Sequence, residues 1–204
     1  MEEPKDMMYL SVVSHDSMRI AFTLAALNDL DMLSASMQNA YLNALMKERV
    51  YMMAGPKFGL DKVGWPILIV RVLYGLKSSG TRWWDHMATT LCEIGFRGCK
   101  ANPNVWMRAV TKLNRDWYWE YILCYIDDIL VISHNPKLIM KDLGDWYTLK
   151  DGSVKELDQY LGVQVKKWYI SNSDEPDKPC WAMSLDVYVK QVITEVELKL
   201  EQVD

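Results

Sequence analysis

Two apolar runs with a pair of aspartates between them form the clearest pattern along the chain. Residues 117–124 and 129–133 are rich in aromatic and β-branched side chains, which is typical of β-strands. The adjacent Asp127 and Asp128 favour a tight turn, because an aspartate side chain bonds to nearby backbone and tolerates turn geometry. We therefore predict a β-hairpin with two carboxylates at its tip.

The rest of the chain alternates between helical and extended spacing of its apolar residues. This mixture indicates the α+β class, and 204 residues are enough for a single domain, 1–204. Helices are predicted over residues 17–28, 38–48, 81–94, from Asn135-Pro136 onward and 185–200, and strands over 32–37, 50–53, 67–72, 105–107, 160–165 and 181–183. Residues 171–179 are predicted to form a polar loop.

Two of the predicted helices have a defined inward face. The inward positions of the first helix follow the spacing of one helix face and are Met18, Ala21, Phe22 and Ala25, widened by Ile20, Leu24 and Leu27. Asp16 or Ser17 is expected to cap this helix. The inward positions of the helix that follows Asn135-Pro136 are expected to be Leu138, Ile139 and Leu143.

Composition and charge narrow the classes of protein that fit. Half of the residues are hydrophobic, which is enough for a packed globular core. The net charge is −4, which argues against a free-standing nucleic-acid binder that relies on a basic surface. The four cysteines form no CxxC pair, which argues against a zinc site. Since the sequence shows no signal peptide, we expect reduced, buried thiols in an intracellular protein. No apolar run approaches the roughly 20 residues of a membrane-spanning helix.

The paired aspartates admit two interpretations. One is a turn that happens to be acidic. The other is a metal site, because hairpin tips prefer Asn-Gly or Asp-Gly and two neighbouring carboxylates repel each other unless a cation lies between them. The local sequence leaves both interpretations open.

Five segments taken together resemble the reverse transcriptase of copia-type retrotransposons. Tyr125-Ile126-Asp127-Asp128 is similar to the YxDD hairpin of that family. YxDD alone is a weak signal, but here it stands in the family's order with other matching segments over most of the chain. These segments are Gln38-Asn39-Ala40-Tyr41-Leu42-Asn43, Leu73-Tyr74-Gly75-Leu76-Lys77 followed by Arg82-Trp83, Ala101-Asn102-Pro103-Asn104-Val105-Trp106, and Tyr160-Leu161-Gly162, the last resembling a strand that grips the primer.

The resemblance implies a polymerase palm, which is an antiparallel sheet backed by helices. It also implies nucleotidyl transfer on an RNA template and a DNA primer. In that mechanism two Mg²⁺ ions clamp the attacking 3′-hydroxyl and the triphosphate. Asp127 and Asp128 would be the catalytic metal ligands, since hard oxygen ligands suit Mg²⁺.

Further roles follow from the same resemblance. Tyr41 would be the aromatic gate that excludes a ribose 2′-hydroxyl, and Tyr125 would lie near the primer end. Lys77 and Arg82 would approach the template or the incoming nucleotide; the alternative for these two is a solvated basic turn. Trp83 is expected to pack in the core instead of touching a ligand.

The sequence departs from the family at its first catalytic aspartate. That aspartate stands five residues before the aromatic gate, where this chain has Ser36. A serine hydroxyl is neutral and cannot replace a carboxylate that bridges two cations. Asp29 and Asp31 are out of register, and an odd shift would also reverse the strand face. The residues before this position are too few for a fingers lobe, and we expect both fingers and thumb to be truncated.

These departures predict a degenerate reverse transcriptase palm that is inactive or nearly so. Two alternatives remain. A non-enzymatic, palm-derived binding or assembly module would associate with a protein partner or with itself through uncovered apolar surface. A different metal-dependent phosphoryl enzyme built on Asp127 and Asp128 would need a third ligand, which the sequence does not indicate.

Overall fold

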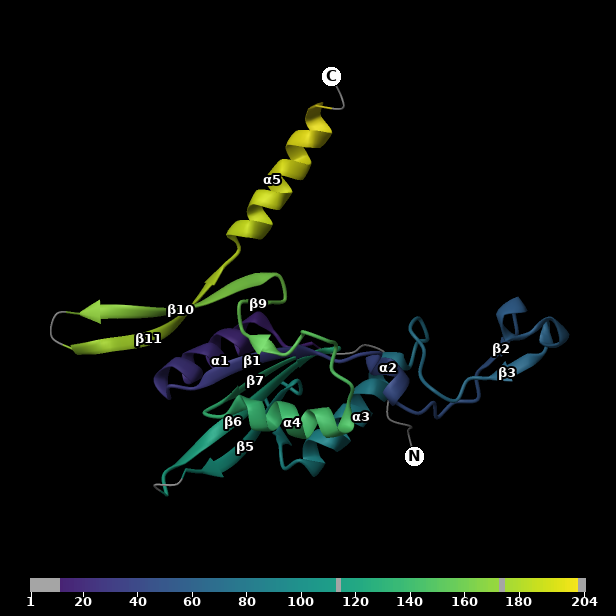
Figure 1. The fold of residues 1–204 in the computed structure, drawn as a ribbon, viewed down its shortest axis with the longest axis horizontal. Helices are drawn as coiled ribbons and strands as arrows, with labels where there is room; N and C mark the ends of the chain where they lie inside the picture. The colour runs from purple at the N-terminus through teal and green to yellow at the C-terminus, as the bar shows by residue number, and fades with distance from the viewer. Residues whose placement is uncertain (1–11, 113–114, 173–174, 202–204) are drawn as a thin grey trace.

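A six-stranded antiparallel sheet forms the centre of the computed structural model, which describes residues 12–112, 115–172 and 175–201 (Figure 1). Neighbouring strands in this sheet are all antiparallel. Their order is β4 (Arg97–Gly98), β5 (Val105–Thr111), β6 (Trp117–Tyr125), β7 (Asp128–Ser133), β1 (Asp31–Ser36) and β8 (Lys155–Glu156).

Two layers cover the faces of this sheet (Figure 1). On one face lie α3 (Ser79–Glu93) and α4 (Pro136–Trp146), and on the other lie α1 (His15–Leu27) and a three-stranded sheet of β9 (Gln159–Tyr160), β10 (Val163–Asn172) and β11 (Glu175–Ser184). Ile122 and Val131 point toward α3 and α4, whereas Leu123 and Leu130 point toward α1. Because both faces are buried, the central strands appear in the sequence as continuous apolar runs.

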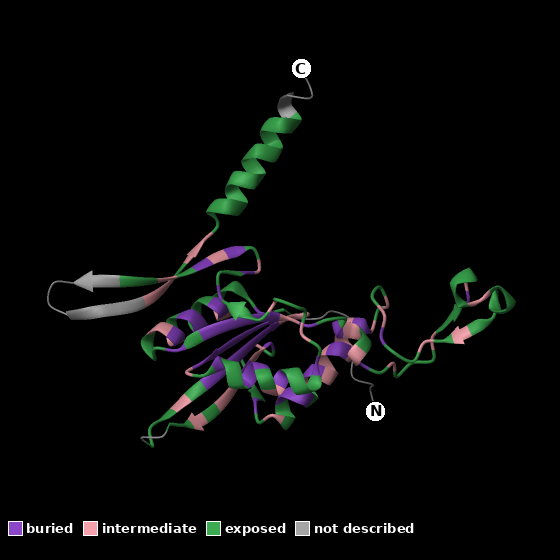
Figure 2. Cartoon of the chain, viewed as in Figure 1, coloured by how far each residue is buried: buried purple, intermediate pink, exposed green. Residues whose placement is uncertain are grey.

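Two segments project from this layered body. The first is an arm that follows α2 (Ala40–Asn43) and consists of β2 (Tyr51–Met53), the 3₁₀ turns η1 (Pro56–Phe58) and η2 (Leu60–Lys62), and β3 (Pro66–Leu68). The second is α5 (Asp186–Glu201), which projects from the body separately from the arm (Figure 1). Both segments are mostly exposed (Figure 2). Within the described ranges, no helix combines the length and apolar character needed to cross a membrane.

The α+β class predicted from the sequence is confirmed. The strand predicted at 32–37 and the helix predicted at 81–94 are present as β1 and α3. Gly95 follows the helix with a φ of +89°, a left-handed conformation that glycine adopts freely and that ends helices. The four predicted inward residues of α1 are all buried, namely Met18, Ala21, Phe22 and Ala25.

The predicted helix over 38–48 is wrong in its length. Only α2 is helical, because Asn39 before it is left-handed with a φ of +50° and Ala44 after it is extended. The strand predicted over 67–72 likewise ends at Leu68. After α2 the chain leaves the body to form the arm, and after β3 it returns toward α3 (Figure 1).

The end of the chain contains two more corrections. The strand predicted over 160–165 is interrupted, because Leu161 and Gly162 have φ values of +51° and +80° and form the turn between β9 and β10. The polar loop predicted over 171–179 consists largely of β10 and β11. β11 is an edge strand of its sheet, and edge strands tolerate proline, so the prolines here do not exclude a strand.

Some predicted side-chain positions also differ. Ser14 caps α1 in place of Asp16 or Ser17, because its hydroxyl oxygen accepts the backbone N–H of Ser17 at 3.2 Å. Three residues predicted to face inward are instead exposed, and they are Ile20, Leu27 and Leu138.

The cysteines are free thiols, but most are not buried as predicted. Cys92 is exposed, Cys99 and Cys180 are half-buried, and Cys124 is buried. Burial raises the pKa of the Cys124 thiol to about 12, because an apolar environment disfavours the charged thiolate.

Candidate functional site

A two-residue turn that contains Ile126 and Asp127 joins β6 to β7. Tyr125 pairs with Asp128 across it, and Ile126 has a left-handed φ of +57°, as the favoured two-residue hairpin loops require at their first position. The predicted hairpin is therefore confirmed. One detail differs, because Asp127 lies in the turn whereas Asp128 is already the first residue of β7.

Two hydrogen bonds from neighbouring elements hold the backbone of this turn. The indole N–H of Trp83 donates to the carbonyl oxygen of Ile126 at 2.7 Å. The backbone N–H of Met37 donates to the carbonyl oxygen of Asp127, also at 2.7 Å. Trp83 is buried in the core as predicted, but its contact with the turn is a second role that no pattern in the sequence signals.

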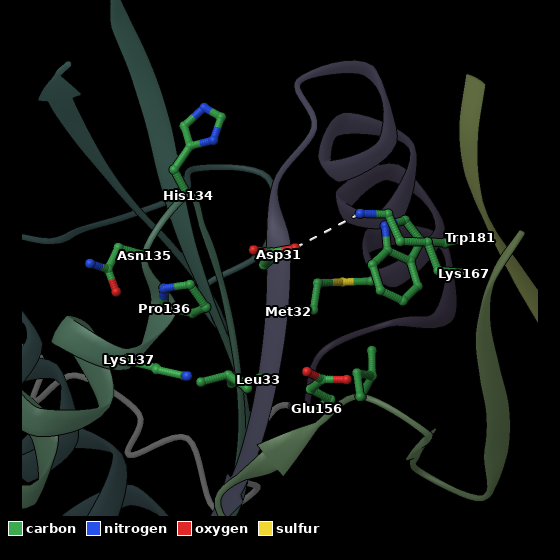
Figure 3. A pocket seen from close by; sticks show the side chains of 11 residues that line it. Asp31, Met32, Leu33, His134, Asn135, Pro136, Lys137, Glu156, Lys167 and Trp181 are labelled. Carbon is green, nitrogen blue, oxygen red and sulfur yellow. Dashed lines mark ion pairs between the residues drawn. The ribbon is translucent and has the colours of Figure 1, made fainter. Parts of the chain in front are cut away.

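Ser36 lies directly opposite Asp128 in the ladder of β1 and β7. Its hydroxyl donates a hydrogen bond to Oδ1 of Asp128. Asp31 pairs with Ser133 at the other end of the same ladder, and its carboxylate lies 3.8 Å from Nζ of Lys167 (Figure 3). As expected from its register, Asp31 does not lie beside Asp128.

The segment that follows α4 lies against the end of β1, and we call residues 147–155 the strap. The backbone N–H of Gln38 donates to the carbonyl oxygen of Thr148 at 2.8 Å. The backbone N–H of Lys150 donates to the carbonyl oxygen of Ser36 at 2.8 Å. The backbone N–H of Ser36 donates to the hydroxyl of Ser153 at 3.2 Å. Both backbone polar groups of Ser36 are therefore bonded to the strap.

The strap also brings a cation to the turn. Nζ of Lys150 lies 2.9 Å from Oδ2 of Asp127. This hydrogen bond is the main reason that the pKa of Lys150 is raised above its ordinary value, since a bonded carboxylate favours the charged ammonium. Sequence reasoning missed Lys150, because a single lysine in a polar stretch carries no periodicity or motif.

Two aromatic residues predicted from the family resemblance lie near the turn. The ring of Tyr41 packs edge-on against Tyr74 with 4.4 Å between centroids. The pKa of Tyr41 is raised mainly by burial and also by the phenol of Tyr74 and the negative charge of Asp127, which places Tyr41 within electrostatic reach of that carboxylate. Tyr125 is half-buried at the end of β6. Tyr125 thus adjoins the turn through its pairing with Asp128, and Tyr41 lies near enough for the charge of Asp127 to affect its hydroxyl.

The two predicted basic residues are placed differently. Lys77 is exposed in the turn before α3. Arg82 lies in the first turn of α3, where its guanidinium contacts Glu48 at 2.5 Å and Asp85 at 3.6 Å. The side chain of Arg82 is only 13% exposed, so the alternative of a solvated basic turn is wrong for this residue. Its ion pair with Glu48 connects the start of the arm to α3.

A cavity of about 290 Å³ opens beside the carboxylates, and it is lined by Ser34, Ser36, Asp128, Ser153, Lys155 and Tyr160 among others. A separate cleft of about 450 Å³ lies around Asp31, Lys137 and Trp181 (Figure 3). The two linings share no residue, and Asp31 in the cleft lies five positions before Ser36 in the cavity, which corresponds to roughly 17 Å at the rise of an extended strand. The cleft in Figure 3 is therefore distinct from the carboxylate site.

The sequence of the chain matches a known protein family over most of its length. Residues 2–200 match the family model described as reverse transcriptase (RNA-dependent DNA polymerase). The chain belongs to this reverse transcriptase family. The resemblance drawn from the five sequence segments is therefore confirmed. Members of the family use divalent metal ions and bind a nucleic-acid template and primer.

Curated relatives of this reverse transcriptase chain are proteins of retrotransposons. The retrovirus-related Pol polyprotein from transposon RE1 of Arabidopsis thaliana is 27% identical over 160 residues, which cover 76% of this chain and 10% of that protein. The putative transposon Ty5-1 protein of Saccharomyces cerevisiae is 27% identical over 165 residues, covering 78% and 48%. The Pol polyprotein from transposon TNT 1-94 of Nicotiana tabacum is 24% identical over 204 residues, covering 95% and 14%. The chain thus spans between a tenth and about half of these relatives.

The oxygen donors at the turn can be compared with the divalent ions that reverse transcriptases use. Mg²⁺ keeps several waters and is commonly bound by one or two carboxylates together with substrate phosphates. Asp127 and Asp128 provide such a set for one ion. Ser36 adds a neutral hydroxyl, and nowhere in the described ranges do three His, Cys, Asp or Glu side chains converge. These oxygen donors are therefore of the kind that one hydrated ion accepts.

Proposed function

We propose that this chain is the palm of a copia-type reverse transcriptase whose capacity for nucleotidyl transfer is impaired. In this proposal Asp127 and Asp128 hold one Mg²⁺ ion. Tyr41 lies on the side of the incoming nucleotide and Tyr125 on the side of the primer end. Ser36 stands where the family has its first catalytic aspartate. An RNA template and a DNA primer are the proposed partners.

The observation that carries the proposal is the pairing of Ser36 with Asp128. Side chains directly opposite in an antiparallel ladder have Cβ atoms about 5 Å apart, so an aspartate at position 36 would bring its carboxylate beside Asp128. The serine donates a hydrogen bond to Asp128 instead and contributes no negative charge. Two divalent ions would therefore share two carboxylates, which leaves the second ion poorly held.

The residues around the turn have separate parts in this proposal. A bound divalent ion would polarise the 3′-hydroxyl and the phosphate oxygens of the substrates. Trp83 and Met37 hold the turn backbone through their hydrogen bonds to Ile126 and Asp127. This restraint limits the movement of the turn before any ion binds. A site held in this way has a more precise geometry than a site on a flexible loop.

Restoring the missing acid tests the proposal. We expect Ser36→Asp to raise extension of a DNA primer on an RNA template by roughly 10²-fold, a typical value for one charged group at an active site. Ser36→Asn is the matched control, because it has the size of aspartate without the charge, and it should leave extension at the basal level. The variants should also differ in affinity for Mn²⁺, which Ser36→Asp should bind more tightly.

Two results would contradict this proposal. One is strong extension by the unmodified chain that disappears in Asp127→Asn, because the site would then be competent with Ser36 in place. The other is equal Mn²⁺ affinity in Ser36→Asp and Ser36→Asn, because position 36 would then not face the ion. Thermal unfolding of each variant establishes that the fold is retained.

A non-enzymatic assembly module is the second candidate, and the exposed apolar residues of α5 favour it. Val192, Ile193 and Val196 are 40%, 50% and 50% exposed. A helix of this length gains little stability in water without packing, so association through α5 would stabilise it. Sedimentation should then show self-association or a complex. A monomer that binds no apolar dye would contradict this candidate and leave the first one unaffected.

A further inference from the structure

Lys150 has a position relative to the carboxylates that the family resemblance did not indicate. Within the described part of the chain, it is the sole cationic side chain with a nitrogen within 4 Å of either Asp127 or Asp128. Its ammonium lies 2.9 Å from Oδ2 of Asp127. The side chains of Lys150 and Asp127 are 48% and 28% exposed, so the ion pair is accessible to ions from solvent.

The backbone on either side of Lys150 is anchored to β1. Lys150 itself donates its N–H to Ser36, Ser153 accepts the N–H of Ser36, and Thr148 accepts the N–H of Gln38. β1 in turn pairs with β7, which begins with Asp128. The strap therefore presents the ammonium from a backbone that is fixed to the carboxylate site, and the contact does not depend on the chance position of a free loop.

Charge balance explains what this contact does. Two neighbouring carboxylates repel each other and require positive charge nearby. A lysine ammonium is a compact point charge with three donors, so it can supply part of that charge when no metal is bound. Because Ser36 adds no third carboxylate, the two aspartates and Lys150 together carry a single net negative charge. A divalent ion is attracted less strongly to this cluster than to the two aspartates alone.

We propose that Lys150 is a built-in counter-ion of the hairpin carboxylates, which a divalent cation has to displace from Asp127 in order to bind. The proposal rests on the proposed function, since it takes Asp127 and Asp128 as the metal ligands. It assigns the strap a role in setting metal affinity. In the metal-free protein Lys150 stabilises the carboxylate pair, and at a given metal concentration it lowers the fraction of sites that hold an ion.

The experiment measures Mn²⁺ binding to the full chain by electron paramagnetic resonance and by line broadening of the amide signals of the turn. We expect Lys150→Met to bind Mn²⁺ roughly fivefold more tightly than the unmodified chain, which is the upper range for an exposed ion pair. Lys150→Arg keeps the charge and should stay close to the unmodified affinity. Lys167→Met is the matched control, because it removes the same charge from a lysine that pairs with a different carboxylate, 3.8 Å from Asp31 at the other end of β1.

The outcomes separate this proposal from the one on which it rests. Tighter binding in Lys150→Met, with Lys167→Met and Lys150→Arg unchanged, supports the counter-ion role. Equal or weaker binding in Lys150→Met overturns that role, while the metal site itself stands. Tighter binding in both methionine variants overturns it as well, because the effect would then reflect net charge alone. If no variant binds Mn²⁺ at the turn, both proposals fail.

Discussion

The two ends of the β6–β7 hairpin both carry carboxylates, but these differ in burial and in the number of their hydrogen-bond partners. At the end far from the turn, Glu120 is 4% exposed. Arg108 donates to it through two nitrogens at 2.9 and 2.8 Å, Tyr118 donates at 3.0 Å and Ser133 at 2.7 Å. This carboxylate is buried, and both of its oxygens accept hydrogen bonds from side chains of the fold.

At the turn the carboxylates are half-buried and have fewer partners. Asp127 is bonded to Lys150, and Asp128 is bonded to the hydroxyl of Ser36. In the part of the chain that the structure describes, these are the side-chain partners of the two carboxylates, one for each. Burial with several donors marks a carboxylate that stabilises the structure, whereas partial exposure with one partner marks a carboxylate that remains able to bind.

The largest effect should come from breaking the buried pair. We expect Arg108→Met to lower the free energy of unfolding by about 3 kcal/mol, because it leaves Glu120 buried without its cation. Urea denaturation measures this loss. Lys150→Met removes the corresponding partner at the turn and should cost less than about 1 kcal/mol. Equal losses in the two variants would show that the two ends of the hairpin do not differ as described.

A smaller effect is expected where the core meets the turn. Trp83→Phe removes the hydrogen bond to Ile126 and should cost about 1 kcal/mol, since a partly buried carbonyl is left without its donor. Trp84→Phe is the control, because the indole N–H of Trp84 is buried and has no acceptor in the described part of the chain. Urea denaturation gives both values. Amide shifts at the turn should move in Trp83→Phe alone, and unchanged shifts there would remove its link to the site.

The last and smallest expected effect is a change of stability at high pH, and it arises from Tyr147 at the start of the strap. Its hydroxyl donates to Oγ1 of Thr90 at 2.7 Å, and burial raises the pKa of Tyr147 to about 12. A tyrosine in the unfolded chain ionises near pH 10. Stability contributed by the neutral hydroxyl is therefore complete below about pH 10 and is lost as the pH rises toward 12.

The absorbance of tyrosinate, taken as the difference between the unmodified chain and Tyr147→Phe, measures this ionisation. A transition near pH 10 in the folded protein would show that Tyr147 is open to solvent and that the strap is not packed as described. Unfolding measured across the same pH range should show a smaller loss of stability in Tyr147→Phe than in the unmodified chain.

The sequence was informative where local spacing determines the outcome. The hairpin followed from its apolar strands and its turn residues, whereas Ser36 was singled out by the family resemblance, five positions before Tyr41. Lys150 and the Trp83 contact could not be predicted, because both depend on segments brought together by the fold. The pairing of Arg82 with Glu48 was hidden for the same reason. The helix after Gln38 was predicted too long, because residues with helical spacing continue into an arm that leaves the core.

β1 is hydrogen-bonded on both sides by strands from much later in the chain, β7 and β8. Ser36 and Asp128 are 92 positions apart, and closing a loop of that size costs entropy before any pairing repays it. During synthesis the ribosome therefore releases β1 well before its neighbours exist. The apolar residues of β1 are therefore exposed and unpaired on the nascent polypeptide, where they are prone to aggregation. Chaperone binding would protect them until the later strands emerge.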